Sequence, residues 1–487
     1  MGKEMLYVKI LPIAQVHEVV RTILEERYHL ENRKLSSSVD SVLHYLKTMK
    51  QDLHVLVEHP YVDRHYRDTY YHYFATKNTF YAKNSIRLSF FAAAHKEEDF
   101  RNADLFDTIQ KSYRGFLVVR PTFPKVIGRS VLDRKAFSDD GFVICNMPFN
   151  STANGIKLDV KGFPHSSQDG EATTCAETTV WSILEYFGNK YAEYAPALPS
   201  QVIGVLGRFS FERLLPSQGL RADQIAYALK ESGFGVKIYA RSKYGADFDR
   251  LVRLYVESGI PVVGVLRNAK VAHALSIVGR RAPSEGDLRK LPVTKLASGL
   301  RVSEYADLDI GYVFVDDNHA PYRVSTLSEH FKQYNDPDWN DCQLTEIIVP
   351  LNKRIYMEAG RARQQAMSLL EGLGAFANST ILIRTFLMSS RSFKHGIGLN
   401  PSLDPSPKEL IMQTPMPKFV WVTEISDVDL MAQNKAKGLI IMDATEPKRS
   451  SVIGAMMEDR YITLDWTTFT KIPVNLPPFT ILQGNLQ

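Results

Sequence analysis

Hydrophobic positions in the middle of the chain follow the periods of regular secondary structure. After Cys175, apolar residues recur on one face of a 3.6-residue helix that is expected to end at Gly188. Two more helices are predicted over 220–233 and 248–258. Short apolar runs predict strands over 236–240, 261–266, 272–279 and 311–317. Helices come first and strands follow, which is the α+β pattern.

The flanking regions mix both kinds of element. Before residue 150, strands are predicted over 5–13, 53–57, 115–119 and 142–145, and helices over 17–30 and 37–49. Beyond residue 350, a helix is predicted over 354–373 and strands over 380–388, 418–423, 438–442 and 461–465. Stretches bearing Pro, Gly and polar residues predict loops at 148–155 and 400–417, and a surface excursion at 283–306. The expected organisation is a mixed α/β domain over 1–150, a central domain over 151–350 and a second α/β domain over 351–487.

An aromatic and basic segment over 61–81 interrupts the N-terminal pattern. Such residues can stack nucleic-acid bases, but this aromatic density favours a strand-rich core with an amphipathic rim. The spacing of His59, His65 and His72 matches no common metal site.

Composition restricts the class of protein further. The chain has 487 residues, is 44% hydrophobic and 23% charged, and carries a net charge of +5 with no Lys/Arg run. Nucleic acid is therefore an improbable partner, and no apolar window is long enough for a membrane span. The N-terminus lacks the apolar core of a signal peptide, and three cysteines without CxxC spacing argue against disulfides and zinc. These features predict a cytoplasmic protein without a metal or organic cofactor.

Cys175 stands where a nucleophile would be expected. Thr173 and Thr174 precede the periodic run and can cap the first helical turn, and Glu177 suggests that this end is exposed. The helix dipole and free N–H groups favour an anion at that position, and therefore a thiolate.

A thiolate nucleophile needs a base and a group that orients the base. His273 begins an apolar strand, and Asp316 and Asp317 end the next one. Alternation along that strand predicts that only one of the two acids faces His273. Asp317 is favoured, because it shares a face with the apolar Val313 and Val315.

The order of these motifs resembles the papain-like cysteine peptidases, and is most similar to their compact branch that includes the bacteriocin-leader-processing peptidases. The resemblance covers residues 154–350 and implies an antiparallel sheet bearing His and Asp, with the Cys helix packed on it. It implies that Cys175 is the nucleophile, His273 the general base and acid, Asp317 the orienting acid and Gln168 the oxyanion donor. The chain departs from the branch in the spacing of Gln168, in Ala176 after the cysteine and in Asn318 after the acids.

The function expected from this constellation is hydrolysis of peptide or isopeptide bonds in a protein or peptide substrate. The same residues would serve a deamidase or transglutaminase acting on glutamine side chains. A third alternative is a catalytically silent papain-like module that binds a partner.

Overall fold

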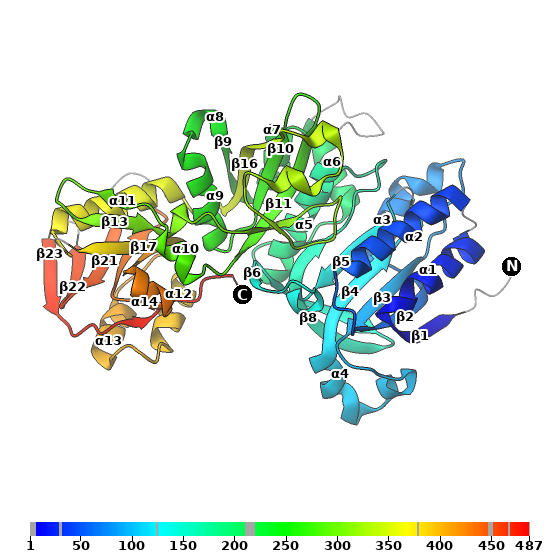
Figure 1. The fold of residues 1–487 in the computed structure, drawn as a ribbon, viewed down its shortest axis with the longest axis horizontal. Coiled ribbons are helices and arrows are strands. Elements are labelled where there is room, and N and C mark those ends of the chain that lie inside the picture. The colour runs from blue at the N-terminus through cyan, green and yellow to red at the C-terminus, as the bar shows by residue number, and fades with distance from the viewer. Residues whose placement is uncertain are drawn as a thin grey trace.

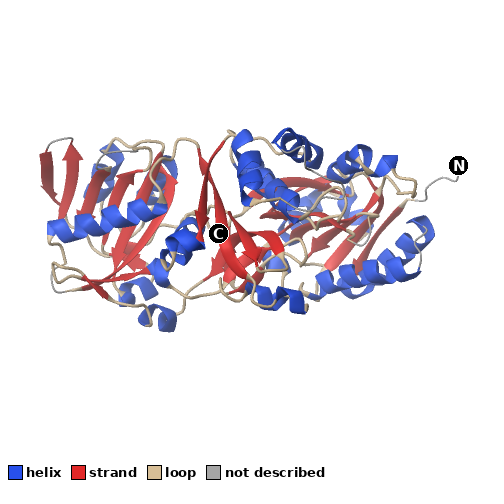
Figure 2. Cartoon of the chain, turned by 90° about the horizontal axis from the view of Figure 1, so that it is seen from above, coloured by secondary structure: helices blue, strands red, loops and turns tan. Residues whose placement is uncertain are grey.

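The chain forms three β-sheets arranged in a row, with helices packed on their faces (Figures 1 and 2). The computed structural model describes residues 6–28, 32–122, 125–209, 220–376, 379–446, 451–465 and 468–486. The mixed α+β class predicted from the sequence is confirmed, and the sheets are largely antiparallel. None of the helices in these ranges has the length and apolar character needed to cross a membrane.

The first sheet has the strand order β1-β2-β3-β4-β5-β8-β7, and all its pairs are antiparallel. Helices α1 and α2 lie side by side against it (Figure 1). Its strands are β1 (Tyr7–Pro12), β2 (His54–Tyr61), β3 (Ser85–Phe91), β4 (Tyr113–Val119), β5 (Ile127–Leu132), β7 (Met147–Ala153) and β8 (Ile156–His165). Its helices are α1 (Ile13–Tyr28), α2 (Asn32–Lys47), α3 (Arg64–His72) and α4 (Phe106–Ser112).

The middle sheet has the order β15-β14-β11-β10-β16-β9, with β6 paired to β11. Its strands are β6 (Phe142–Ile144), β9 (Phe234–Ala240), β10 (Val262–Arg267), β11 (Ala272–Arg281), β14 (Tyr312–Val315), β15 (Arg323–Ser325) and β16 (Gln343–Asn352). The associated helices are α5 (Cys175–Lys190), α6 (Pro199–Phe209), α7 (Ala222–Glu231), α8 (Arg241–Tyr244) and α9 (Asp247–Glu257). Helix α5 contacts β11 as well as β7 and β8 of the first sheet.

The third sheet has the order β12-β13-β17-β18-β20-β21-β22-β23, with a parallel pair only between β13 and β17 among the strands described. Its strands are β12 (Thr294–Lys295), β13 (Arg301–Glu304), β17 (Thr380–Ser389), β18 (Phe419–Ser426), β20 (Gly438–Asp443), β21 (Val452–Met457), β22 (Arg460–Asp465) and β23 (Thr468–Pro473). A separate ribbon pairs β19 (Lys435–Ala436) with β24 (Phe479–Thr480). The helices are α10 (Glu285–Arg289), α11 (Ala359–Leu373), α12 (Ser390–Gly398), α13 (Pro405–Gln413) and α14 (Val428–Ala432).

The middle sheet is apolar on both faces, and each face belongs to a different core. Val313 and Val315 pack in the core shared with the first sheet and α5, whereas Tyr312 and Phe314 pack in the core shared with the third sheet. Side chains alternate along a strand, so consecutive residues of β14 join opposite cores. The first, middle and third sheets, each with its helices, are therefore held together by continuous hydrophobic packing.

The strand pairing does not follow the predicted boundaries. The expected loop at 148–155 instead contains most of β7, in which every second residue is buried. Pro148 fits there because β7 is an edge strand, where a missing N–H is tolerated. The proposed boundary at 150 falls inside β7, and the first sheet continues to His165.

Three other local predictions are wrong. The segment 61–81, predicted to be strand-rich, contains α3, whose start is capped by Asp63 accepting from the Tyr66 N–H at 2.8 Å. The excursion at 283–306 supplies α10, β12 and β13. The loop at 400–417 contains α13, because Pro405 occupies a first-turn position where proline is favoured.

Candidate active site

Cys175 is the first residue of α5, as predicted, and is half-buried. A tight turn precedes it, in which one carboxylate oxygen of Asp169 accepts from the N–H groups of Glu171, Ala172 and Thr173 at 2.7–2.9 Å. The N–H and hydroxyl groups of Thr174 both donate to Glu177. Glu177 is buried, so the prediction that it marks an exposed helix end is wrong.

His273 lies at the start of β11 and is hydrogen-bonded to Asp316. Its Nε2 is 3.0 Å from Asp316 Oδ1 and 3.6 Å from Asp317 Oδ1. Helix α5 is tied to the same strand, since the Thr179 hydroxyl donates to the Ala274 carbonyl at 3.3 Å. The structure thus brings Cys175, His273 and both acids together.

The electrostatics of the group favour a protonated imidazole. Burial alone would lower the pKa of His273, but the charges of Asp316 and Cys175 and the hydrogen bond to Asp316 raise that pKa well above its ordinary value. Burial would raise the pKa of Asp316, yet the charge and hydrogen bond of His273 hold it well below its ordinary value. The arrangement therefore favours an imidazolium beside the ionised Asp316 carboxylate.

The expectation that only one acid faces His273 is wrong, and the hydrogen bond falls on Asp316 rather than on the favoured Asp317. The register of β11 against β14 explains why, because Ile277 lies opposite Phe314. His273 has the parity of Ile277, and Asp316 has the parity of Phe314, so these two side chains start from the same face. Asp317 also reaches the imidazole, because β14 ends at Val315 and both acids lie beyond it, where strict alternation no longer applies.

Asp317 has a different environment from its neighbour. Burial raises its pKa to about 6 against the lowering effect of His273, and the charge of Asp316 adds to the rise. The charge of Lys125 and the backbone of Gln168 oppose it. The ionised form of Asp317 is therefore less stabilised by its surroundings than the ionised form of Asp316.

Asp316 is held by groups that the sequence did not single out. Its Oδ1 also accepts from the Asn318 N–H at 2.9 Å, and its Oδ2 accepts from Tyr334 and from His330 at 3.3 Å. Its backbone carbonyl accepts from His165 Nε2 at 3.2 Å. Burial lowers the pKa of His165 to about 4, so this imidazole is neutral near pH 7. These contacts fix the carboxylate that orients His273.

Trp339 extends this support to the histidine ring. It stacks on Tyr334 at a ring distance of 3.5 Å and meets His273 edge to face at 5.2 Å. A concentration of His and aromatic residues after Asp317 was the available signal in the sequence. Neither helical nor strand periodicity marked these residues.

Gln168 lies beside the acids, in the loop between β8 and α5. Its side-chain Nε2 donates to Asn318 Oδ1 at 3.2 Å, and Lys125 Nζ donates to the same oxygen. The structure thus places Gln168 against the residue that follows Asp317.

The aromatic segment over 61–81 forms hydrogen bonds and an ion pair with the loop before Cys175. Glu171 accepts from Tyr73 at 2.9 Å and from Tyr81 at 3.4 Å, and it pairs with Lys77 at 2.7 Å. These contacts give the segment a structural role next to the loop that leads into Cys175.

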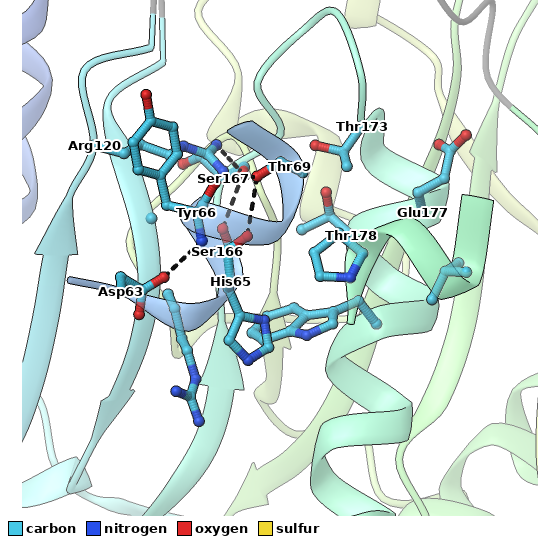
Figure 3. A pocket seen from close by; sticks show the side chains of 15 residues that line it. Asp63, His65, Tyr66, Thr69, Arg120, Ser166, Ser167, Thr173, Glu177 and Thr178 are labelled. Carbon is cyan, nitrogen blue, oxygen red and sulfur yellow. Dashed lines mark hydrogen bonds between the residues drawn. The ribbon is translucent and has the colours of Figure 1, made fainter. Parts of the chain in front are cut away.

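A small cavity lies between α3 and the start of α5 (Figure 3). Its volume is about 30 Å³, which is enough for a water molecule. Arg120 lines it and donates to the Ser167 carbonyl at 2.5 Å, while His65 and Trp181 form its other end. The start of α5 therefore lies against polar groups from the first sheet and α3.

The same cluster has the residue types of a metal site. One ligand atom each from His273, Asp316 and Asp317 lies within 4.8 Å of the others. Both oxygens of Asp316 already accept hydrogen bonds, so a cation would have to displace His273 from it. The contacts thus fit a protonated imidazole better than a metal ion. His59, His65 and His72 form no such group in the described part of the chain.

The sequence matches no family model and no curated protein.

Proposed function

We propose that the protein is a papain-like cysteine peptidase, or a closely related thiol hydrolase, in which Cys175 is the nucleophile. The observation that carries the proposal is the order Cys175, His273, Asp316: a half-buried thiol at a helix start, a buried histidine whose charge interacts with that thiol, and a carboxylate 3.0 Å from Nε2 of the histidine.

The roles of the two ring nitrogens of His273 follow from which one is hydrogen-bonded to Asp316. Asp316 takes Nε2 of His273, which leaves Nδ1 for the thiol and for the leaving group. The Cys175 thiolate attacks the carbonyl carbon, and imidazolium Nδ1–H gives its proton to the leaving amine. Water then hydrolyses the thioester, with His273 as the base. Asp316 keeps the ring oriented and stabilises its charge throughout.

The oxyanion would be held at the N-terminus of α5, where backbone N–H groups are unpaired within the helix. Gln168 is the proposed side-chain donor. Its amide donates to Asn318, so it would have to turn towards the substrate oxygen to act.

The deciding experiment is alkylation of the native protein by iodoacetamide from pH 5 to 9, with each cysteine followed by peptide mass spectrometry. Cys175 should react at pH 6, where a free thiol with a pKa of about 8.5 is almost fully protonated. Cys145 and Cys342 are internal references, because both are buried and burial raises both pKa values, that of Cys145 to about 12.

His273→Ala should slow the alkylation of Cys175 at pH 6 by about 10- to 100-fold, since the imidazolium no longer stabilises the thiolate. Equal alkylation of Cys175 in both proteins would contradict the proposed pair. Reaction of Cys145 in the variant would indicate unfolding.

A further inference from the structure

A second, larger cavity adjoins the catalytic acids. It has a volume of about 550 Å³, within the range typical of ligand pockets. One wall is the polar face of α2, and the other comes from the start of β5 and the loop after β14. The polar residues lining it are Ser37, Asp40, Ser41, His44, Lys125, Ser167, Asn318 and His319.

Asn318 connects this cavity to the catalytic group. Its backbone N–H donates to Asp316, and its side-chain oxygen accepts from Gln168 and Lys125 while its residue lines the cavity. A molecule in the cavity would therefore lie next to the proposed oxyanion donor and the orienting acid.

The wall nearest the acids offers hydrogen-bond donors. Lys125 is half-buried, and no carboxylate of the described residues lies within 4.0 Å of its ammonium group. An ammonium carries three donors, and Asn318 uses one. Nε2 of His319 is buried and has no hydrogen-bond partner in the described part of the chain. The Lys125 ammonium suits a carboxylate, whose hydrogen bonds to cations are among the strongest. Burial lowers the pKa of His319 to about 4, so this ring is neutral near pH 7 and adds one donor in its Nε2–H tautomer.

We infer that this cavity is a substrate subsite that recognises a carboxylate through Lys125, with α2 of the N-terminal unit as its far wall. The inference rests on the proposed thiol chemistry and deepens it: the substrate is a peptide with an acidic side chain, or a free terminal carboxylate, close to the reacting carbonyl. It also gives the N-terminal unit a role in recognition.

Bromoacetyl tripeptide amides test this directly. The Cys175 thiolate forms a bond to the bromoacetyl CH₂ carbon, and bromide leaves with the bonding electron pair. Peptides with Glu at one position are compared with peptides with Gln there, and free C-termini with amidated ones. We expect the acidic peptide to label Cys175 about tenfold faster, as a charge-assisted contact predicts.

Variants locate the preference. The rate ratio should fall to about one in Lys125→Gln and below one in Lys125→Glu. The ratio within each variant cancels any change in the reactivity of Cys175. Asp40→Asn is the matched control, because it removes a charge of opposite sign from the same cavity and should raise the ratio or leave it unchanged.

The outcomes separate the two ideas. A preference for Glu identifies a side-chain carboxylate, and a preference for the free terminus identifies a terminal one. Equal labelling by acidic and neutral peptides, or a ratio that Lys125→Gln leaves unchanged, overturns the subsite. Failure of Cys175 to react with any peptide and with iodoacetamide contradicts the proposed function, and the subsite with it.

Discussion

Asp316 and Asp317 are adjacent and both buried, yet their environments push their pKa values in opposite directions. Asp316 accepts hydrogen bonds from His273, His330 and Tyr334, which stabilise its anion. Asp317 lies 3.6 Å from the same imidazole, without a comparable set of donors. Asp316 therefore ionises at a lower pH than Asp317.

Replacing each acid by its amide should separate their roles. Asp316→Asn should slow alkylation of Cys175 at pH 6 by about 10- to 100-fold, because the imidazolium loses its nearest anion. Asp317→Asn is the matched variant, and a change of about threefold or less is expected. Peptide mass spectrometry gives both rates. A larger loss in Asp317→Asn would return the orienting role to Asp317.

The two amides should also change stability in opposite ways. The pKa of Asp317 is raised in the folded protein, so its ionisation costs stability as pH rises from about 3.8 to about 6. Asp317→Asn should therefore be more stable at pH 8, by up to about 3 kcal/mol, with the difference vanishing near pH 4. Asp316 has a lowered pKa and contributes stability above pH 3.8, which is lost only as pH falls through its folded pKa. Asp316→Asn should be less stable at pH 8, and urea unfolding at both pH values measures each change.

At the scale of elements, α5 and the turn before it place Cys175, the proposed nucleophile. Asp169 orders the turn from within, and Glu171 ties it to the aromatic segment around α3. Gly188 lets α5 pass close to the chain near Pro196, since an added Cβ would lie 2.2 Å from the Pro196 nitrogen. The helix continues two residues beyond this glycine, so Gly188 serves close packing rather than termination.

Glu171→Gln tests whether the aromatic segment steadies this turn. Loss of the Lys77 pair and weaker contacts to Tyr73 and Tyr81 should speed amide exchange in residues 168–174 about three- to fivefold. Global stability should fall by about 1 kcal/mol or less, as for an exposed ion pair. Hydrogen exchange read by mass spectrometry measures the first effect.

Glu193→Gln is the control for this prediction. It removes a half-exposed pair with Lys418 of the C-terminal region. Amide hydrogen exchange in residues 168–174 should then stay at the wild-type rate. An equal increase in both variants would show that the contacts of Glu171 do not specifically stabilise this turn.

At the scale of the molecule, the middle sheet has two apolar faces and depends on other elements to cover both of them. One face needs the first sheet and α5, and the other needs the third sheet. Sequence segments also pair with sheets other than that of their neighbours in the chain. Strand β6 precedes β7 and β8 but joins the middle sheet, and β13 lies in the third sheet. Leu486, near the end of the chain, pairs with Cys145. The chain is therefore expected to unfold as a strongly coupled unit.

A fragment of residues 151–350, the domain expected from the sequence, should not fold alone. It lacks β6, most of the first sheet, and β17, which pairs with β13, so both apolar faces of the middle sheet would be exposed. Size-exclusion chromatography and thermal unfolding by circular dichroism should show aggregation or no cooperative transition, unlike the full chain. A monomeric fragment with a sharp transition and an alkylatable Cys175 would contradict this view.

The sequence by itself determined what depends on near neighbours. The spacing of apolar residues located α5 and the strands that carry His273 and Asp316, and the threonines before Cys175 placed it at the helix start. Sequence order also brought Cys175, His273 and the acids into consideration together. Local spacing determines these features because a helix or strand period is written into consecutive residues.

Only the tertiary structure decided what depends on register and on distant partners. The pairing of β11 with β14 selected Asp316 over Asp317, and the chain after β15 supplied His330 and Tyr334 to hold it. Packing against the first sheet buried Glu177, and pairing with β17 turned an expected excursion into strand β13. These outcomes are set by contacts between residues far apart in the chain, which no local pattern records.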